Sequence, residues 1–356
     1  MGVLAHFLSS YFPPPEALLM PCVGVDLSDR SVKFVFLKKR GKKIELVAHG
    51  GAAIPEGLIR NGVIEKPAQV GAICKTLLAA SGSSFASLSL PEEKAYVFTL
   101  TLPDVKREDL RAAVELQLES HVPLAPENSI FDIDIVEEKG NETTIAVSVF
   151  PRDILGGYLE VLSVAGLVPA RFEIEAQSVA RALIPRGKKE SYIIVDLGRS
   201  RTGFAIVSGG IVQHSATVPV GGDAFTNTLV TRLGLSPEVA KKTKEERGLL
   251  RTKDNEAVCE ALSGAASALR DEIGKHYEFW NKRSSAGITA IYICGGDANV
   301  PGMREYLSTG FSAPVEYGNP WVNIISPDDS VPQVEFNESL QYTSALGLAL
   351  AAFESR

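Results

Sequence analysis

Two stretches of the chain share one pattern of apolar and polar positions. Residues 25–34, VDLSDRSVKF, and residues 195–204, VDLGRSRTGF, each place an acid at the end of an apolar strand. In both, a polar turn with serine follows, and a phenylalanine marks the next strand. Each stretch continues into another turn and another strand. The pattern therefore predicts that one β-hairpin design occurs twice.

Apolar spacing predicts further elements after the first hairpin. Apolar residues at 70, 73, 74, 77 and 78 lie on one face of a helix, and Gly82 follows where helices often end. Residues 87–90 and 95–102 are typical of strands, and Pro103 closes this block. The first part of the chain is therefore expected to mix helices and strands.

A small helix-strand-strand-helix subdomain is predicted as an insertion at about 104–165. Its first helix carries a row of apolar residues, Leu110, Val114 and Leu118. Residues 131–136 and 143–150 alternate like half-buried strands, and residues 154–167 have the pattern of a second helix.

The rest of the chain repeats strand, glycine turn and helix. The expected elements are a helix at 173–183, a strand from 192, a strand-turn-helix unit at 217–234, a charged helix at 237–248, a long helix at about 255–282, a second strand-turn-helix unit at 289–307 and a core helix at 343–353.

Composition narrows the classes of protein. The 356 residues suffice for two domains or one bilobed body, and 45% hydrophobic residues can fill a substantial core. A net charge of −7 argues against a general nucleic-acid binder. Four widely spaced cysteines without a CxxC pair indicate reduced thiols in a cytoplasm rather than a disulfide or zinc framework.

The apolar N-terminus is too short to span a bilayer, and no transmembrane segment is expected. Residues 1–20 are interpreted as a flexible tail, with a docking arm for a partner or membrane surface as the alternative.

Several common catalytic motifs are absent from the sequence: GxxxxGK[ST], GxGxxG, HExxH and GxSxG. What remains is a set of turns at strand ends. Backbone N–H groups and hydroxyls in such turns hold phosphate oxygens. The acids Asp26 and Asp196 suit a hydrated Mg²⁺ that bridges to phosphate. Glycine turns at 221–222 and 295–296 allow a ligand to approach the backbone closely.

The order DLSDRSVK, DLGRSRT, VGGDAFT and CGGDANVPGM resembles the actin, Hsp70 and sugar-kinase superfamily. Within it, residues of about 20–352 are similar to the PilM family of type IV pilus assembly proteins, relatives of the division protein FtsA. The resemblance implies an α/β, bilobed, actin-like ATPase fold with a duplicated ribonuclease-H-like core and the small inserted α+β subdomain. It implies a first lobe at 21–190 and a second at 191–356, with a helical subdomain at about 225–285.

The resemblance also implies a site for ATP and Mg²⁺. The residues carried over to the nucleotide are Asp26, Ser28, Asp29, Ser31 and Lys33 in the first turn, Asp196, Gly198, Ser200 and Thr202 in the second, Gly221, Gly222 and Asp223 near the ribose and phosphates, Lys244 at the nucleoside, and Gly295, Gly296 and Asp297 in the adenosine turn. Asp26 and Asp196 would hold Mg²⁺ through water. Glu175 is a candidate for orienting water, with a structural role at a helix start as the alternative.

The sequence departs from the family pattern in three places. Ser28 stands where relatives carry glycine, and a positive φ there would cost serine about 1–2 kcal/mol. We therefore expect Asp29 or Arg30 to take the unusual angle. Arg199 and Arg201 are expected to pair with phosphate or to face water, and Lys241 replaces an acid. These departures favour ATP binding with at most weak hydrolysis.

The resemblance implies a cytoplasmic ATP-binding adaptor at the inner face of the cytoplasmic membrane. Its partner would be the cytoplasmic N-terminal segment of a PilN-like membrane protein, docked between the first lobe and the inserted subdomain. Self-association stays open. The alternatives are an FtsA-like division protein, a type II secretion scaffold and a small-molecule kinase. The chain ends LALAAFESR without a basic amphipathic helix, which disfavours the FtsA-like alternative.

Overall fold

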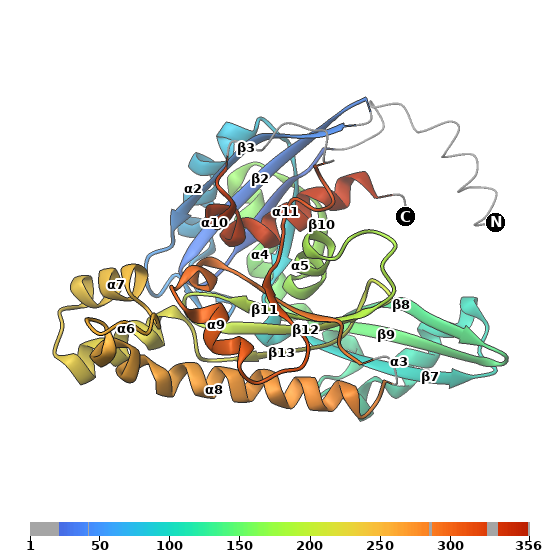
Figure 1. Cartoon of the computed structure of the whole chain (residues 1–356). Helices are drawn as coiled ribbons and strands as arrows, with labels where there is room; N and C mark the ends of the chain where they lie inside the picture. The colour runs from blue at the N-terminus through green and yellow to red at the C-terminus, as the bar shows by residue number, and fades with distance from the viewer. Residues whose placement is uncertain (1–20, 42, 285–286, 326–333, 355–356) are drawn as a thin grey trace.

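Two five-stranded sheets of the same design form the centre of the two lobes (Figure 1). The computed structural model describes residues 21–41, 43–284, 287–325 and 334–354. The first sheet has the order β3-β2-β1-β6-β10, and its strands are β1 (Val23–Leu27), β2 (Ser31–Arg40), β3 (Lys43–Ala53), β6 (Phe85–Leu90) and β10 (Val168–Ile174). The second has the order β13-β12-β11-β14-β15, and its strands are β11 (Ser191–Leu197), β12 (Thr202–Ser208), β13 (Ile211–Val218), β14 (Ala290–Cys294) and β15 (Val315–Tyr317).

The pairing confirms that the hairpin design is duplicated. In each sheet three antiparallel strands lead the order, and two further strands continue it in parallel. Strand β1 in the first sheet and strand β11 in the second are the middle strands, and both are almost fully buried, as their apolar sequences require. Each sheet therefore carries an aspartate near the carboxyl end of its middle strand.

Helices cover both faces of each sheet. In the first lobe α2 (Pro67–Leu78) and α4 (Arg152–Ala165) share a core with one face, and α11 (Thr343–Leu350) lies on the other. In the second lobe α6 (Gly222–Leu233), α7 (Pro237–Glu246) and α8 (Glu256–Asn281) cover one face, and α5 (Glu175–Leu183) the other.

Helices α5 and α11 join the two lobes at the centre of the molecule (Figure 1). Helix α5 belongs to the core of the second sheet, whereas α11 packs on strands β1 and β2 of the first. The two helices pack against each other, and the hydroxyls of Ser178 and Ser344 lie 3.0 Å apart at their contact. The helix predicted at 173–183 and the core helix predicted at 343–353 thus correspond to α5 and α11, which set the lobes side by side.

The inserted subdomain has its own sheet, which extends to one side of the molecule (Figure 1). Its strands β7 (Tyr96–Pro103), β9 (Glu142–Pro151) and β8 (Ser129–Lys139) pair in that order, and α3 (Leu110–His121) packs on one face. We call residues 96–151 the inserted module.

The module's bounds differ from the expected 104–165 at both ends. Strand β7 belongs to the module's sheet, because it pairs with β9 along its whole length. Helix α4 belongs to the first lobe, because Tyr158, Val161 and Leu162 share a core with Val70 and Cys74 of α2.

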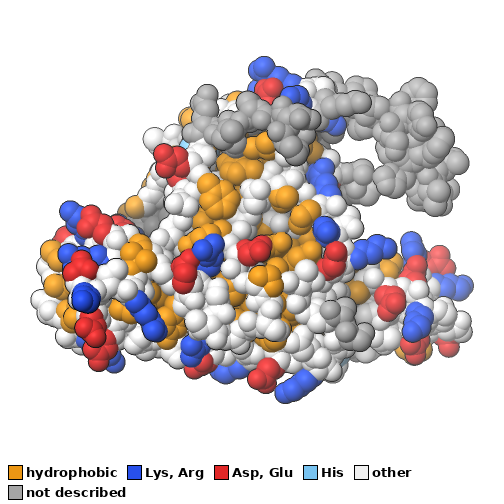
Figure 2. Space-filling model, in the orientation of Figure 1, with side chains coloured by type: hydrophobic (Ala, Val, Ile, Leu, Met, Phe, Trp, Pro, Cys, Tyr) orange, Lys and Arg blue, Asp and Glu red, His pale blue; other side chains and the backbone are white. Residues whose placement is uncertain are grey.

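The face in Figure 2 carries acidic and basic side chains interspersed at its two ends, over α7 and over the module, with more apolar surface between. No helix among the described residues is both long and apolar enough to cross a membrane. The predicted N-terminal tail, residues 1–20, lies outside the described residues.

Candidate functional site

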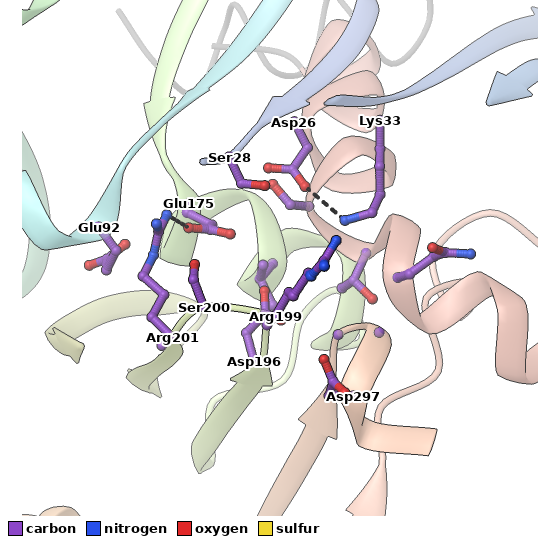
Figure 3. A pocket seen from close by; sticks show the side chains of 18 of the residues that line it. Asp26, Ser28, Lys33, Glu92, Glu175, Asp196, Arg199, Ser200, Arg201 and Asp297 are labelled. Atoms are coloured by element: carbon purple, nitrogen blue, oxygen red, sulfur yellow. Dashed lines mark hydrogen bonds and ion pairs between the residues drawn. The ribbon is translucent and has the colours of Figure 1, made fainter. Parts of the chain in front are cut away.

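The two strand-end turns meet at a cavity of about 260 Å³ between the lobes. The structure brings most of the expected site residues to its walls (Figure 3). These are Asp26, Ser28, Ser31, Lys33, Glu175, Asp196, Gly198, Ser200, Gly295, Gly296 and Asp297. The duplicated hairpins therefore place two aspartates and three hydroxyls around one space.

The first turn adopts its shape without an unusual backbone angle. Among the described residues, only Asn61 and Asp104 have positive φ without being glycine, so the expectation for Asp29 or Arg30 is wrong. The turn is closed by the N–H of Ser28, which donates to the carbonyl of Ser31 at 2.9 Å. The Ser28 hydroxyl also donates to that carbonyl, at 3.1 Å.

The second turn is closed by the same hydrogen bond. The N–H of Gly198 donates to the carbonyl of Arg201 at 3.0 Å. Here glycine is required by close approach, because a Cβ on Gly198 would lie 2.8 Å from that carbonyl oxygen. The equivalent position in the first turn, Ser28, has room for a side chain, and its hydroxyl faces the cavity.

The two aspartates differ in their neighbours across the sheet. Asp26 faces Lys33 across the β1–β2 pair, with 3.9 Å between Oδ2 and Nζ, and Asp26 Oδ1 accepts from the Ser89 hydroxyl at 3.1 Å. Asp196 faces Gly203 across the β11–β12 pair, where the first sheet has its lysine. Burial, together with the charge of Asp26, raises the pKa of Asp196 to about 6, although Lys33 and Arg201 oppose the shift.

This arrangement fits a hydrated divalent cation. A cation between the two carboxylates would offset their repulsion, and oxygen ligands are those Mg²⁺ prefers. Among the described residues, no three His, Cys, Asp or Glu side chains cluster so that they could hold a metal ion. Mg²⁺ is usually bound by one or two carboxylates and keeps several waters.

Arg201 takes a different place from the one expected. It lines the cavity with a side chain only 15% exposed, 2.8 Å from the Glu93 carboxylate and 3.4 Å from that of Glu175. Its charge is therefore already paired with two acids. Glu175 is the first residue of α5, and burial raises its pKa well above the ordinary value. Asp26 and Asp196 raise the pKa further, while Arg201 opposes the shift.

A family model for the type IV pilus assembly protein PilM matches residues 24–353 of this sequence. The chain belongs to the PilM family. The match covers nearly the whole chain, in agreement with the predicted extent of about 20–352, and favours pilus assembly over the division, secretion and kinase alternatives.

Solved structures confirm the actin-like fold expected for the PilM family. The chain is similar to a chain of a structure described as the PilM-PilN type IV pilus biogenesis complex, with a TM-score of 0.80, 20% identity, and coverage of 95% of this chain and 100% of that one. It is also similar to MreB5 of Spiroplasma citri bound to ADP, with a TM-score of 0.56, 14% identity, and coverage of 96% and 100%.

A curated relative matches over a shorter stretch. The ethanolamine utilization protein EutJ of Escherichia coli strain K12 is 29% identical over 155 residues, 44% of this chain. The alignment spans half of the length of that relative.

Six expected site residues of this PilM-family chain do not line the cavity. They are Asp29, Thr202, Gly221, Gly222, Asp223 and Lys244. The Asp29 carboxylate accepts from the N–H groups of Asn61 and Gly62, at 2.8 and 3.0 Å, and so holds a neighbouring loop. Thr202 donates its hydroxyl to the Val220 carbonyl at 2.6 Å. Both side chains thus support the turns from outside.

The start of α6 supports the second turn instead of opening to the cavity. The N–H of Gly222 donates to the Gly198 carbonyl at 3.0 Å, and that of Asp223 to the Arg199 carbonyl at 2.8 Å. A Cβ on Gly222 would overlap the Asp297 carboxylate. Lys244 is buried, pairs with Asp297 and donates to the Gly222 carbonyl at 3.2 Å. Gly222 and Lys244 therefore pack the helical subdomain against the turn that contains Asp297.

Glu92 lines the cavity, although the sequence patterns did not predict it as a site residue. It stands shortly after strand β6, at the edge where the two aspartates end their strands. Its Oε2 accepts from the Ala176 N–H at 2.9 Å, and its Oε1 has no hydrogen-bond partner among the described residues. Burial raises the pKa of Glu92 to about 7, although the hydrogen bond from the Ala176 N–H opposes the shift. Its signal was an acid that closely follows a buried strand.

Proposed function

We propose that this protein is an ATP-binding adaptor of the type IV pilus assembly platform. Its bilobed body holds Mg-ATP in the cavity between the lobes and docks the cytoplasmic N-terminal segment of a PilN-like membrane protein. We propose a nucleotide site because Asp26 and Asp196 lie on the walls of one cavity that hydroxyls of the two turns also line.

The phosphate end of the cavity has the donors that a nucleotide needs. Hydroxyls of Ser28, Ser31 and Ser200 face it, and Lys33 adds an ammonium group from β2. Hydroxyls and a lysine are common phosphate partners. Bound Mg²⁺ would neutralise phosphate charge. The chain's own part is to hold that ion through the waters bound to Asp26 and Asp196.

The nucleoside end is expected at the turn of Gly295, Gly296 and Asp297, which lines the same cavity. Structures of MreB5 described as bound to ADP and to AMPPNP share this fold at TM-scores of 0.56 and 0.54. The fold is thus one on which nucleotides are held, and the residues present here suit that use.

Slow turnover is the expected behaviour of this site. A general base must be ionised to accept a proton. Burial and the neighbouring acids raise the pKa of Glu175, which favours its neutral form, and the cation beside it, Arg201, is shared with Glu93. We therefore propose that ATP stabilises the adaptor and is hydrolysed weakly.

Calorimetric titration of the full chain with Mg-ATP, with phosphate release followed on the same sample, tests this proposal. We expect saturable binding with little release. Rapid release would argue for a cycling motor or a kinase, and no binding would leave an actin-like scaffold that works without nucleotide. The same titration with EDTA separates the contribution of Mg²⁺.

The partner part of the proposal rests on the inserted module and on the likeness to the PilM-PilN complex. The sheet face opposite α3 carries Asp132 and Asp134, and the charges of Glu173 in β10 and Arg181 in α5 act on Asp134. That face therefore lies near the junction of β10 and α5, and the space beside it is the proposed docking side.

Charge reversal tests the docking side with a matched control. Asp132→Lys with Asp134→Lys should weaken binding of a PilN-like N-terminal peptide, measured by fluorescence anisotropy, and leave Mg-ATP affinity unchanged. Glu119→Lys lies on exposed α3, on the other face, and serves as the control. Equal peptide affinity in all three proteins would count against this docking side.

A further inference from the structure

Two arginines at the cavity share one carboxylate that lies outside it. Arg30 comes from the first turn and Arg199 from the second, and both line the cavity. Asp223, near the start of α6, is 3.1 Å from Arg199 Nε and 3.8 Å from Arg30 Nε. Arg30 also pairs with the exposed Glu56, at 3.1 Å. Asp223 thus neutralises two cations that face the space between the lobes.

We propose that Asp223 is a resident counter-anion, which the phosphate groups of a nucleotide displace from Arg30 and Arg199. This inference rests on the nucleotide site proposed above. It gives the two arginines a direct part in binding phosphate, and it makes Asp223 a determinant of which ligands enter.

The pairs are accessible enough to exchange. The side chains of Arg30, Asp223 and Arg199 are 28%, 35% and 55% exposed, so water reaches each of them. Ion pairs at such positions contribute little to stability. A phosphate group has more charge and more acceptor oxygens than a carboxylate, and arginine binds it in a bidentate manner. A triphosphate therefore competes well for both guanidinium groups.

The pair between Arg30 and Asp223 also joins the lobes. Arg30 belongs to the first lobe and Asp223 to the second. The cavity of about 260 Å³ lies just below the range of roughly 300–1,000 Å³ usual for ligand sites. Exchange of Asp223 for phosphate would release this cross-lobe contact and let the cavity widen around a nucleotide.

A selective barrier follows from this arrangement. A ligand without phosphate does not compensate Arg30 and Arg199, so it leaves Asp223 in place. A ligand with two or three phosphates replaces it. The alternative, a contact between Asp223 and the ribose, predicts the opposite sign, because loss of the carboxylate would then weaken every adenosine ligand.

Calorimetry on the full chain distinguishes the two. The variant is Asp223→Asn, and the control is Asp271→Asn, which removes the same charge from an exposed position on α8. The probes are Mg-ATP, inorganic tripolyphosphate with Mg²⁺, and adenosine. Each exposed ion pair is worth up to about fivefold in an equilibrium constant. We expect Asp223→Asn to bind Mg-ATP and tripolyphosphate roughly five- to twentyfold more tightly, with adenosine unchanged and Asp271→Asn like the wild type.

A second substitution checks the route. Arg199→Gln should remove most of the gain when added to Asp223→Asn, and alone it should lower tripolyphosphate affinity, so the inference stays testable if Asp223→Asn folds poorly. Unchanged or weaker Mg-ATP binding by Asp223→Asn overturns the inference alone when the wild type binds ATP. If the wild type and both variants bind neither ATP nor tripolyphosphate, this inference and the proposed nucleotide site fail together.

Discussion

Replacement of Asp26 by asparagine should weaken nucleotide binding while it leaves the stability of the fold almost unchanged. The amide oxygen of the introduced side chain can keep the hydrogen bond from Ser89, and the variant loses only the charge that faces Lys33. At 3.9 Å and an effective dielectric constant of about 20, that attraction is about 4 kcal/mol before solvation. Lys33 is partly exposed, so screening and desolvation leave about 1 kcal/mol.

A compensating gain arises at Asp196. The charge of Asp26 is one cause of the raised pKa of Asp196, so its removal lowers that pKa from about 6 toward the ordinary value. Ionisation of Asp196 then costs less free energy in the folded protein at neutral pH. We therefore expect the free energy of unfolding of Asp26→Asn to stay within about 1 kcal/mol of the wild type in urea titrations.

Nucleotide affinity should change far more. A charge-assisted contact to the hydrated cation is worth about 1.5–3 kcal/mol, which corresponds to a loss of roughly 10- to 150-fold in Mg-ATP affinity. Calorimetry at a pH of about 7.5, where Asp196 with its raised pKa is mostly ionised, measures it, with Asp132→Asn on the module as the control. A folded Asp26→Asn variant with wild-type affinity would refute the assignment of the cation to this pair of strand ends.

Three further predictions concern the same turns. Arg201→Met leaves Glu93 and Glu175 without their cation and should lower the free energy of unfolding by about 3–5 kcal/mol in urea titrations. The control Arg199→Met removes a more exposed cation and should cost under about 1 kcal/mol. Similar losses in both variants would contradict the network around Arg201. Ser28→Gly should fold and lose only about 0.5–1 kcal/mol, because its φ is not positive; a clear gain in melting temperature would indicate strain at serine. Because the folded pKa of Asp196 is raised to about 6, without added Mg²⁺ its ionisation should lower wild-type stability as the pH rises from about 4 to 6, by at most about 3 kcal/mol. Asp196→Asn should lack this pH-dependent difference in melting curves; equal profiles would count against the raised pKa.

Much of the fold followed from local patterns, because strand and helix periods are local properties. The repeated apolar strand, acid and turn predicted one hairpin design that occurs twice, and the structure places the two hairpins in sheets with the same strand order. The bounds of the module were predicted wrongly because α4 would be amphipathic whether it packed on the module or on the first lobe. Only tertiary packing assigns Tyr158 to the first lobe.

The direction of each turn side chain was harder to predict. The Thr202 hydroxyl donates to the Val220 carbonyl, 18 positions away, and the partners of Asp29, Lys244 and Glu92 lie 32, 53 and 84 positions away in the chain. Local patterns do not bring such distant partners together, so these side chains could not be placed from the sequence.

We propose that one cation and one nucleotide occupy the space between the two strand ends. A crystal structure of the protein with Mg²⁺ and a non-hydrolysable ATP analogue tests this most directly. We expect Mg²⁺ held through water by Asp26 and Asp196, with phosphate oxygens against Ser28 and Ser200 and the base near Gly296. A nucleotide bound elsewhere, or a cation that contacts neither aspartate, would contradict it.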